Sequence, residues 1–157
     1  MNALEMLDDS HLMVIQAVDH LHELEWEKPG ACGEWTVKEI LAHLTSYELA
    51  LIDGLNTFLG HEPTPYISGF MKNIQEFNAQ EVEKRRYKMA QHVLDEYNDA
   101  QLQTGSLLAQ IPTERIQQTG IVPGYDKNRS LNDVIKFFHD HAREHCEQIN
   151  RFREKLK

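Results

Sequence analysis

The chain lacks features typical of secreted or membrane proteins, because it has few cysteines, no long apolar stretch and no basic N-terminal segment. Its 157 residues include only two cysteines, Cys32 and Cys146, too few for a disulfide framework and too far apart for a metal-binding knuckle. No stretch approaches the roughly 18 to 20 apolar residues that cross a bilayer. Acidic residues occupy the N-terminal segment, where a signal peptide carries basic ones. We therefore expect a cytoplasmic protein with reduced thiols and no membrane association.

Positive charge is also scarce, because 16 lysines and arginines stand against 25 acidic residues, for a formal net charge of −9. Such a field repels a nucleic-acid backbone unless a basic patch overcomes it. The densest basic run, residues 84–88 (KRRYK), is flanked by Glu81 and Glu83 and is typical of a solvated helix face. The sequence predicts no nucleic-acid partner.

Proline and glycine are few and clustered, near residues 29–33, 60–65, 112 and 120–124. Between these clusters, apolar residues recur every three or four positions, which indicates helices at about residues 2–25, 36–58, 70–111 and 131–156. The third block turns polar over residues 78–88, which favours a break near Arg86. No segment alternates as a strand does. The sequence therefore predicts an all-α four-helix bundle in a single domain, residues 1–157.

Three of the four blocks begin with the pattern of a capping box. A side-chain oxygen at the first position can accept from a backbone N–H three residues later, while an acidic side chain there reaches back. The pairs are Asn2 with Glu5, Thr36 with Glu39 and Ser130 with Asp133. These pairs predict where the first, second and fourth helices start.

Three of the nine histidines form a candidate metal site. His141 and His145 are four residues apart, so they lie one turn apart on one helix face, and this spacing recurs as half of a zinc site. His145 lies on the apolar stripe of the last block, where an imidazole without partners is costly. His43 lies at the edge of the inward stripe of the second block and would face this pair in an antiparallel bundle. Three nitrogens would leave coordination positions for water or substrate.

Other residues are weaker candidates, and the three histidines have an alternative interpretation as core-edge side chains bonded to carboxylates or carbonyls. His11 lies on the stripe of the first block and, with Tyr47 and Phe138, is a candidate for lining the pocket. Glu48 would act as a general base or support a metal ligand, or else be a surface carboxylate. His139 is expected to be solvated. Surface positions are also expected for His20, His22, His61 and His92.

Two segments resemble a known superfamily. Residues 33–44 (GEWTVKEILAHL) resemble the opening of the second helix in the DinB-like superfamily, also called YfiT-like, and residues 141–149 (HAREHCEQI) resemble the close of its last helix. The resemblance spans nearly the whole chain. It implies a four-helix bundle with up-down-down-up connections and a divalent metal held by three histidines. The matching positions are His43, His141 and His145, the same three that helical geometry selects.

The resemblance also implies a class of chemistry. Families in this group include transferases and isomerases that use bacillithiol or mycothiol, and proteins that hydrolyse or sequester reactive compounds; residues 77–82 (FNAQEV) look like a subgroup of self-resistance proteins against genotoxins. We therefore expect a metal-dependent enzyme that transfers a low-molecular-weight thiol to a small electrophilic substrate, or hydrolyses it, in detoxification or stress. The alternative is a non-catalytic bundle that binds a small molecule or confers self-resistance. No residue matches a thiol pocket, so the reaction stays open.

The expected cofactor is one divalent metal: Zn, Ni, Fe or Mn. Three imidazoles and water suit several of these ions equally, so the ligand set does not choose among them. We expect a homodimer, because bundles of this kind commonly pair helices between protomers.

Overall fold

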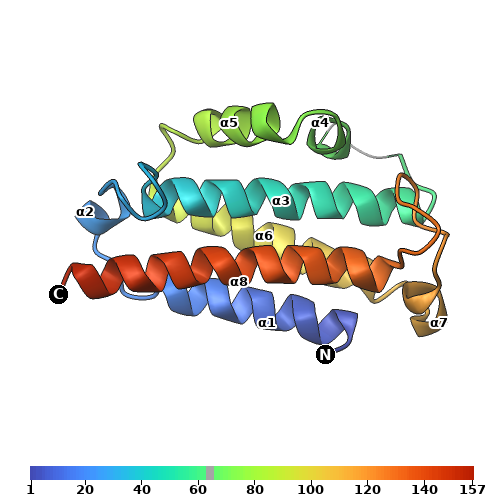
Figure 1. Cartoon of the computed structure of the whole chain (residues 1–157). Helices are drawn as coiled ribbons and strands as arrows, with labels where there is room; N and C mark the ends of the chain where they lie inside the picture. Colours follow the sequence, from blue (N-terminus) through green and yellow to red (C-terminus); the bar gives the residue numbers. More distant parts are fainter. Residues whose placement is uncertain (63–65) are drawn as a thin grey trace.

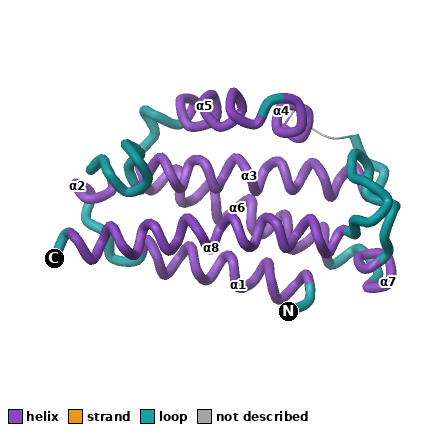
Figure 2. The backbone as a smooth tube through the Cα atoms, in the orientation of Figure 1, coloured by secondary structure: helices purple, strands orange, loops and turns teal. Residues whose placement is uncertain are grey.

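The computed structural model describes residues 1–62 and 66–157, and every regular element in that part of the chain is a helix. Four long helices form the bundle (Figures 1 and 2): α1 (Ala3–Val18), α3 (Val37–Phe58), α6 (Ala90–Leu108) and α8 (Leu131–Lys155). Four shorter ones lie in the connections: α2 (Glu23–Trp26), α4 (Tyr66–Lys72), α5 (Ile74–Lys84) and α7 (Thr113–Gln117). The predicted all-α four-helix bundle is confirmed.

The bundle consists of two closely packed pairs, α1 with α8 and α3 with α6. Contacts of α1 with α6 and of α3 with α8 close the ring. In Figure 1, α1 and α8 run in one direction while α3 and α6 run in the other, which is the up-down-down-up order. Because α3 and α6 are parallel, the chain must return along the bundle between them. The segment that returns carries α4 and α5 over the outer side of α3.

All three predicted capping boxes are present. The Asn2, Thr36 and Ser130 side chains each accept from the backbone N–H three residues on, and the acidic residue at that position accepts from the cap's own backbone N–H. In α3, the Glu39 N–H donates to Thr36 Oγ1 over 3.0 Å. These caps satisfy N–H groups that a helix start leaves without partners, and they fix the register of the histidines that follow.

The first helix is shorter than predicted. The apolar stripe suggested a helix to about residue 25, but α1 ends at Val18, and His20 has the left-handed φ of 59°. Asp19 is already extended, and neither an extended nor a left-handed residue has the backbone angles that continue an α-helix. The chain then turns into the separate helix α2, whose Trp26 is buried with apolar residues of α1, α3 and α8.

The third block divides as its polar stretch indicated. The predicted break near Arg86 is confirmed, because α5 ends at Lys84 and α6 begins at Ala90. The predicted start at residue 70 is late, since α4 already begins at Tyr66, and Asn73 caps α5 between the two short helices. The turn predicted at residues 60–65 falls partly on residues 63–65, which lie outside the described residues.

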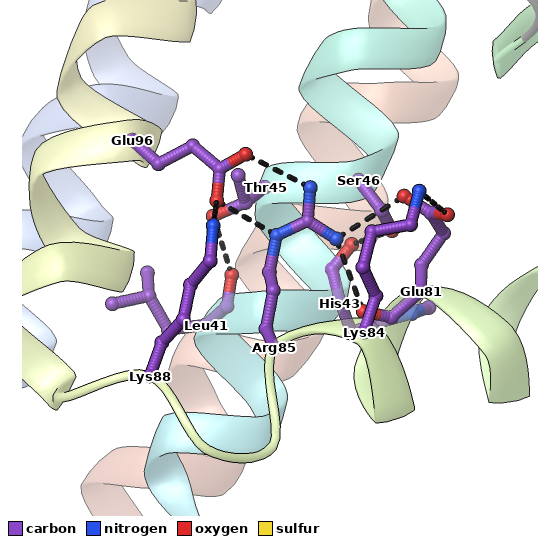
Figure 3. A network of polar contacts seen from close by, with 9 residues as sticks. All are labelled: Leu41, His43, Thr45, Ser46, Glu81, Lys84, Arg85, Lys88 and Glu96. Atoms are coloured by element: carbon purple, nitrogen blue, oxygen red, sulfur yellow. Dashed lines mark hydrogen bonds and ion pairs between the residues drawn. The ribbon is translucent and has the colours of Figure 1, made fainter.

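The expectation that the basic run 84–88 forms a solvated face is wrong at Arg85, which is 1% exposed. Its guanidinium donates to both carboxylate oxygens of Glu96 on α6, over 2.8 and 2.9 Å, and to Glu81 Oε1 over 3.1 Å (Figure 3). The break after α5 turns this side chain toward α3, and the partner that neutralises it comes from a different helix. Neighbouring Arg86 has 61% of its side chain exposed.

Candidate metal centre

Helices α3 and α8 bring three histidines together. The Thr36 cap sets the start of α3, and His43 follows about two turns later. His141 and His145 rise one turn apart from the middle of α8. Because α3 and α8 are antiparallel neighbours, the ring of His43 meets those of the pair.

The imidazole nitrogens converge on one point. His43 Nε2 lies 3.0 Å from His141 Nε2, and His145 Nε2 lies 3.2 Å from the same atom. Ligand atoms of the three residues all lie within 4.8 Å of one another, and among the described residues this is the one group of three or more metal-ligating side chains that converges in this way. Nitrogens bound tetrahedrally to zinc at 2.0–2.1 Å lie about 3.3 Å apart. The cluster therefore has the dimensions of a three-nitrogen metal site.

All three imidazoles are held in the neutral, metal-binding form. Burial, together with the neighbouring histidines of the cluster, lowers the pKa of His43 to about 2 and that of His141 to about 3. Burial lowers the pKa of His145 as well. A neutral imidazole carries a single hydrogen, which leaves the other nitrogen with a free lone pair. Near neutral pH the cluster therefore offers lone pairs and no positive charge.

Hydrogen bonding within the cluster does not satisfy these nitrogens. His145 Nδ1 lies 2.8 Å from Gln148 Oε1, an acceptor, so the hydrogen of His145 belongs on Nδ1 and its Nε2 presents a lone pair. His141 Nε2 faces two imidazole nitrogens and can donate at most one hydrogen. His43 Nδ1 is buried without any hydrogen-bond partner. One divalent cation would accept all the converging lone pairs at once, so these residues fit a metal.

Aromatic rings enclose the cluster. Tyr47 stacks on His141 with ring centroids 4.2 Å apart and planes 13° apart, and its centroid is 4.5 Å from that of His43. Trp35 contacts His43 from the loop before α3, at 5.1 Å between centroids. Phe138 lies next to Tyr47, at 6.0 Å. The predicted pocket residues Tyr47 and Phe138 therefore lie beside the histidines.

Two other candidates lie elsewhere. Glu48 follows His43 by five residues, so it points about 140° away around α3, and its Oε2 is 3.1 Å from Thr104 Oγ1 on α6. Its burial raises the pKa of this carboxyl to about 7. His11 also contacts α6, where its Nε2 lies 3.0 Å from Asn98 Oδ1. The structure does not bring Glu48 or His11 to the histidine cluster.

The expectation that His139 is solvated is wrong, because this residue is only 4% exposed. Its Nε2 lies 2.7 Å from Asp9 Oδ2 on α1, and Arg143 lies 3.2 Å from its Nδ1. Helix α8 packs against α1 on one side and against α3 on another, so side chains that point in different directions from α8 are both buried. The sequence pattern showed only one of these faces.

Three residues near the cluster were missed as functional candidates. Gln148 orients His145, and its position three residues along the same helix was the signal that could have found it. Trp35 was used only as part of a motif. Asn78 on α5 bonds to the Tyr47 side chain, while its own Oδ1 is buried and has no hydrogen-bond partner. No local pattern could have paired Asn78 with Tyr47, because the two residues lie on different helices, and α5 meets α3 only where the return segment folds back over it.

A family model described as the DinB superfamily matches residues 6–149. The chain belongs to the DinB superfamily. The match includes all three clustered histidines and most of the length of the four bundle helices, so the resemblance of the two short motifs is confirmed. A search of curated proteins found no match, and neither did a search of solved structures. None of the described helices is both long and apolar enough to span a membrane.

Proposed function

We propose that this DinB superfamily protein is a metal-dependent enzyme, in which His43, His141 and His145 hold one divalent cation and the substrate is a small electrophilic compound. The observation that carries the proposal is the convergence of neutral imidazole nitrogens, with Nε2 atoms 3.0 and 3.2 Å apart. The reaction is either the transfer of a low-molecular-weight thiol to the electrophile or the hydrolysis of the electrophile.

The donor set supports catalysis over a purely structural site. Structural zinc sites use four protein ligands, whereas three leave a position for water, a thiol or substrate. Zn, Ni, Fe or Mn bound there would polarise an electrophile and lower the pKa of a bound water or thiol. His141 is only partly buried, which leaves one side of the cluster open to a ligand.

The surrounding side chains have roles in this proposal. Trp35 and Tyr47 exclude water from the buried side of the histidines and hold their rings in place. Burial raises the pKa of Tyr47, so its hydroxyl stays protonated and can donate a hydrogen bond to a bound substrate. Gln148 keeps the Nε2 lone pair of His145 directed into the cluster.

Metal analysis tests the site directly. We expect the purified protein to contain about one divalent metal per chain and His145→Ala to lose it, with little change in helical circular dichroism. His92→Ala is the matched control, because His92 is an exposed histidine on α6. A wild-type protein that retains no metal after incubation with Zn, Ni, Fe and Mn would contradict the proposal.

A second experiment separates catalysis from binding. The metal-loaded protein is assayed with 1-chloro-2,4-dinitrobenzene and a panel of thiols that includes bacillithiol and mycothiol, before and after a chelator. We expect chelator-sensitive conjugation or hydrolysis. Saturable binding of an electrophile without turnover would favour the alternative, a non-catalytic bundle that sequesters a reactive compound or confers self-resistance.

The proposal includes a quaternary state and excludes two partners. We infer a homodimer, to be checked by light scattering, as expected for a superfamily whose bundles pair helices between protomers. We also infer that the protein works without nucleic acid, because its net charge of −9 opposes a polyanion. The proposal likewise includes no membrane partner.

A further inference from the structure

The described residues line a cavity of about 310 Å³, partly open to solvent, that lies away from the histidines toward the other end of α3. It lies between the second half of α3, α4, the segment after α7 and the start of α8, the end of the bundle at which α4 and α7 are drawn in Figure 1. Ile67, Met71, Val122 and Phe138 are among the apolar side chains that line it. None of the described residues that line it carries a charge, and the Thr57 hydroxyl already donates to the Asp53 carbonyl oxygen.

One residue that lines this cavity is a glycine in the middle of a helix. Gly54 belongs to α3 and lines the cavity, and a Cβ built on it would meet nothing within 4 Å. Glycine inside a helix costs about 1 kcal/mol relative to alanine. Local rules are broken most often at functional sites, and here a larger side chain would fit but would fill the space. The open volume and the helix-destabilising residue therefore point to a ligand.

We propose that this cavity binds a small uncharged apolar molecule or apolar group, about the size of a fused two-ring aromatic. Its 310 Å³ is roughly twice the ~150 Å³ cavity that accommodates benzene, and it falls at the lower end of the range for small-molecule sites. An ionised group would lose its hydration there and gain no charged partner. We therefore expect the site to bind uncharged ligands more tightly than charged ligands of the same shape.

The cavity and the histidine cluster share a wall. Phe138 lines the cavity, and its ring stacks on Phe70 at 5.8 Å. Both rings contact Tyr47, which stacks on His141. The occupant is therefore either a separate apolar compound or the apolar part of a substrate whose reactive end reaches the histidines. The cavity itself contains none of the three histidines, so the proposal stands or falls without the metal.

The test uses 2-naphthol, which is uncharged at neutral pH, and 2-naphthoate as its charged analogue. Each is titrated into the full-length, isotope-labelled protein with and without a chelator and followed by NMR. We expect saturable one-to-one binding of 2-naphthol in both states, nuclear Overhauser contacts to methyl groups of Val122, Leu131 and Val134, and at least about tenfold weaker binding of 2-naphthoate.

Two glycine variants give a matched pair. Gly54→Leu fills the cavity and is expected to weaken 2-naphthol binding by about tenfold or more. Gly105→Leu is the control, because Gly105 also lies inside a helix, has nothing within 4 Å of a built Cβ, and does not line the cavity. Binding by this control is expected to stay within about twofold of wild type.

The proposal is overturned if wild type shows no saturable binding, if the contacts map elsewhere, or if folded Gly54→Leu binds as wild type does. Should Gly54→Leu fail to fold, the contact map of wild type decides alone. With Co²⁺ bound, a change in the visible spectrum on adding 2-naphthol identifies the occupant as part of the metal-centre substrate, and an unchanged spectrum identifies it as a separate compound. Both results support an apolar site. Because binding is also measured without metal, a failure of the cavity proposal can be told apart from a failure of the proposed enzyme.

Discussion

Gln148 lies about one turn after His145 on α8, and its side-chain carbonyl oxygen is 2.8 Å from His145 Nδ1. This contact directs the opposite nitrogen of His145 into the cluster, as partners of metal-bound histidines do. We expect Gln148→Ala to weaken metal binding by roughly 10- to 100-fold, measured by competition with a chromophoric chelator. Gln148→Glu retains an acceptor and should bind at least as tightly as wild type. Equal affinities for all three proteins would exclude this role.

Tyr47 combines ring packing with a hydroxyl to which the proposed function assigns a contact with substrate. Tyr47→Phe keeps the ring stacked on His141, so metal affinity should stay near wild type while turnover falls. Tyr47→Ala removes a ring that is 6% exposed and should lower the free energy of unfolding by about 3–5 kcal/mol. Steady-state kinetics and urea unfolding of both variants separate the two roles. Full activity in Tyr47→Phe would remove the hydroxyl from the mechanism.

The network around Arg85 should contribute strongly to stability. Arg85→Ala leaves the buried Glu81 without the guanidinium and is expected to lower the free energy of unfolding by about 3–5 kcal/mol. Arg86→Ala removes the neighbouring charge at an exposed position and should change it by less than about 0.5 kcal/mol. Urea unfolding of the two variants side by side gives the comparison. Equal losses would mean that the buried contacts contribute little.

Glu48 should make the protein less stable as the pH rises from about 4.5 to about 7. Its pKa is about 7 in the folded protein against an ordinary value of 4.5, so the folded state keeps a proton that the unfolded chain loses. The stabilising effect is complete below pH 4.5 and is lost as the pH rises through about 7, by roughly 3 kcal/mol. Glu48→Gln removes this dependence. The difference in unfolding free energy between variant and wild type should therefore grow in favour of glutamine from pH 4.5 to pH 8.

The protonated form of Glu48 also fits the hydrogen bonds of Thr104. Thr104 Oγ1 lies 2.9 Å from the Ala100 carbonyl oxygen and 3.1 Å from Glu48 Oε2, but a hydroxyl has one hydrogen to donate. If that hydrogen goes to Ala100, a protonated Glu48 can donate its own to Thr104. A pH-independent difference between Glu48→Gln and wild type would contradict this arrangement.

Much of the architecture was predictable because it depends on local patterns. The capping boxes at Asn2, Thr36 and Ser130 need only residues three apart, and the helical stripes need only a period of 3.6. The spacing of His141 and His145 placed both on one face, and the stripe of α3 placed His43 near them. The convergence of the three histidines thus followed from the sequence once the bundle was assumed.

Apart from the helix boundaries at Val18 and Tyr66, the failed predictions involve contacts between distant segments. His139 is buried because α1 lies alongside α8 and supplies Asp9, and Arg85 is buried because α6 supplies Glu96. No pattern within one helix contains these pairings. Glu48 neither reaches the histidines nor lies at the surface, because α3 is buried on nearly all sides by α6, α8 and the return segment. A single stripe could not say which side of α3 faced the histidines.

The three histidines lie where the two helix pairs meet, and this position affects how the bundle would move. His43 comes from the α3–α6 pair, and His141 and His145 come from the α1–α8 pair, so a cation bound by all three would tie the two helix pairs together. Amide hydrogen exchange should then be faster without metal along the facing sides of α3 and α8, while the α3–α6 and α1–α8 contacts stay protected. Occupancy of a single ion would set how far the two helix pairs separate during thermal motion.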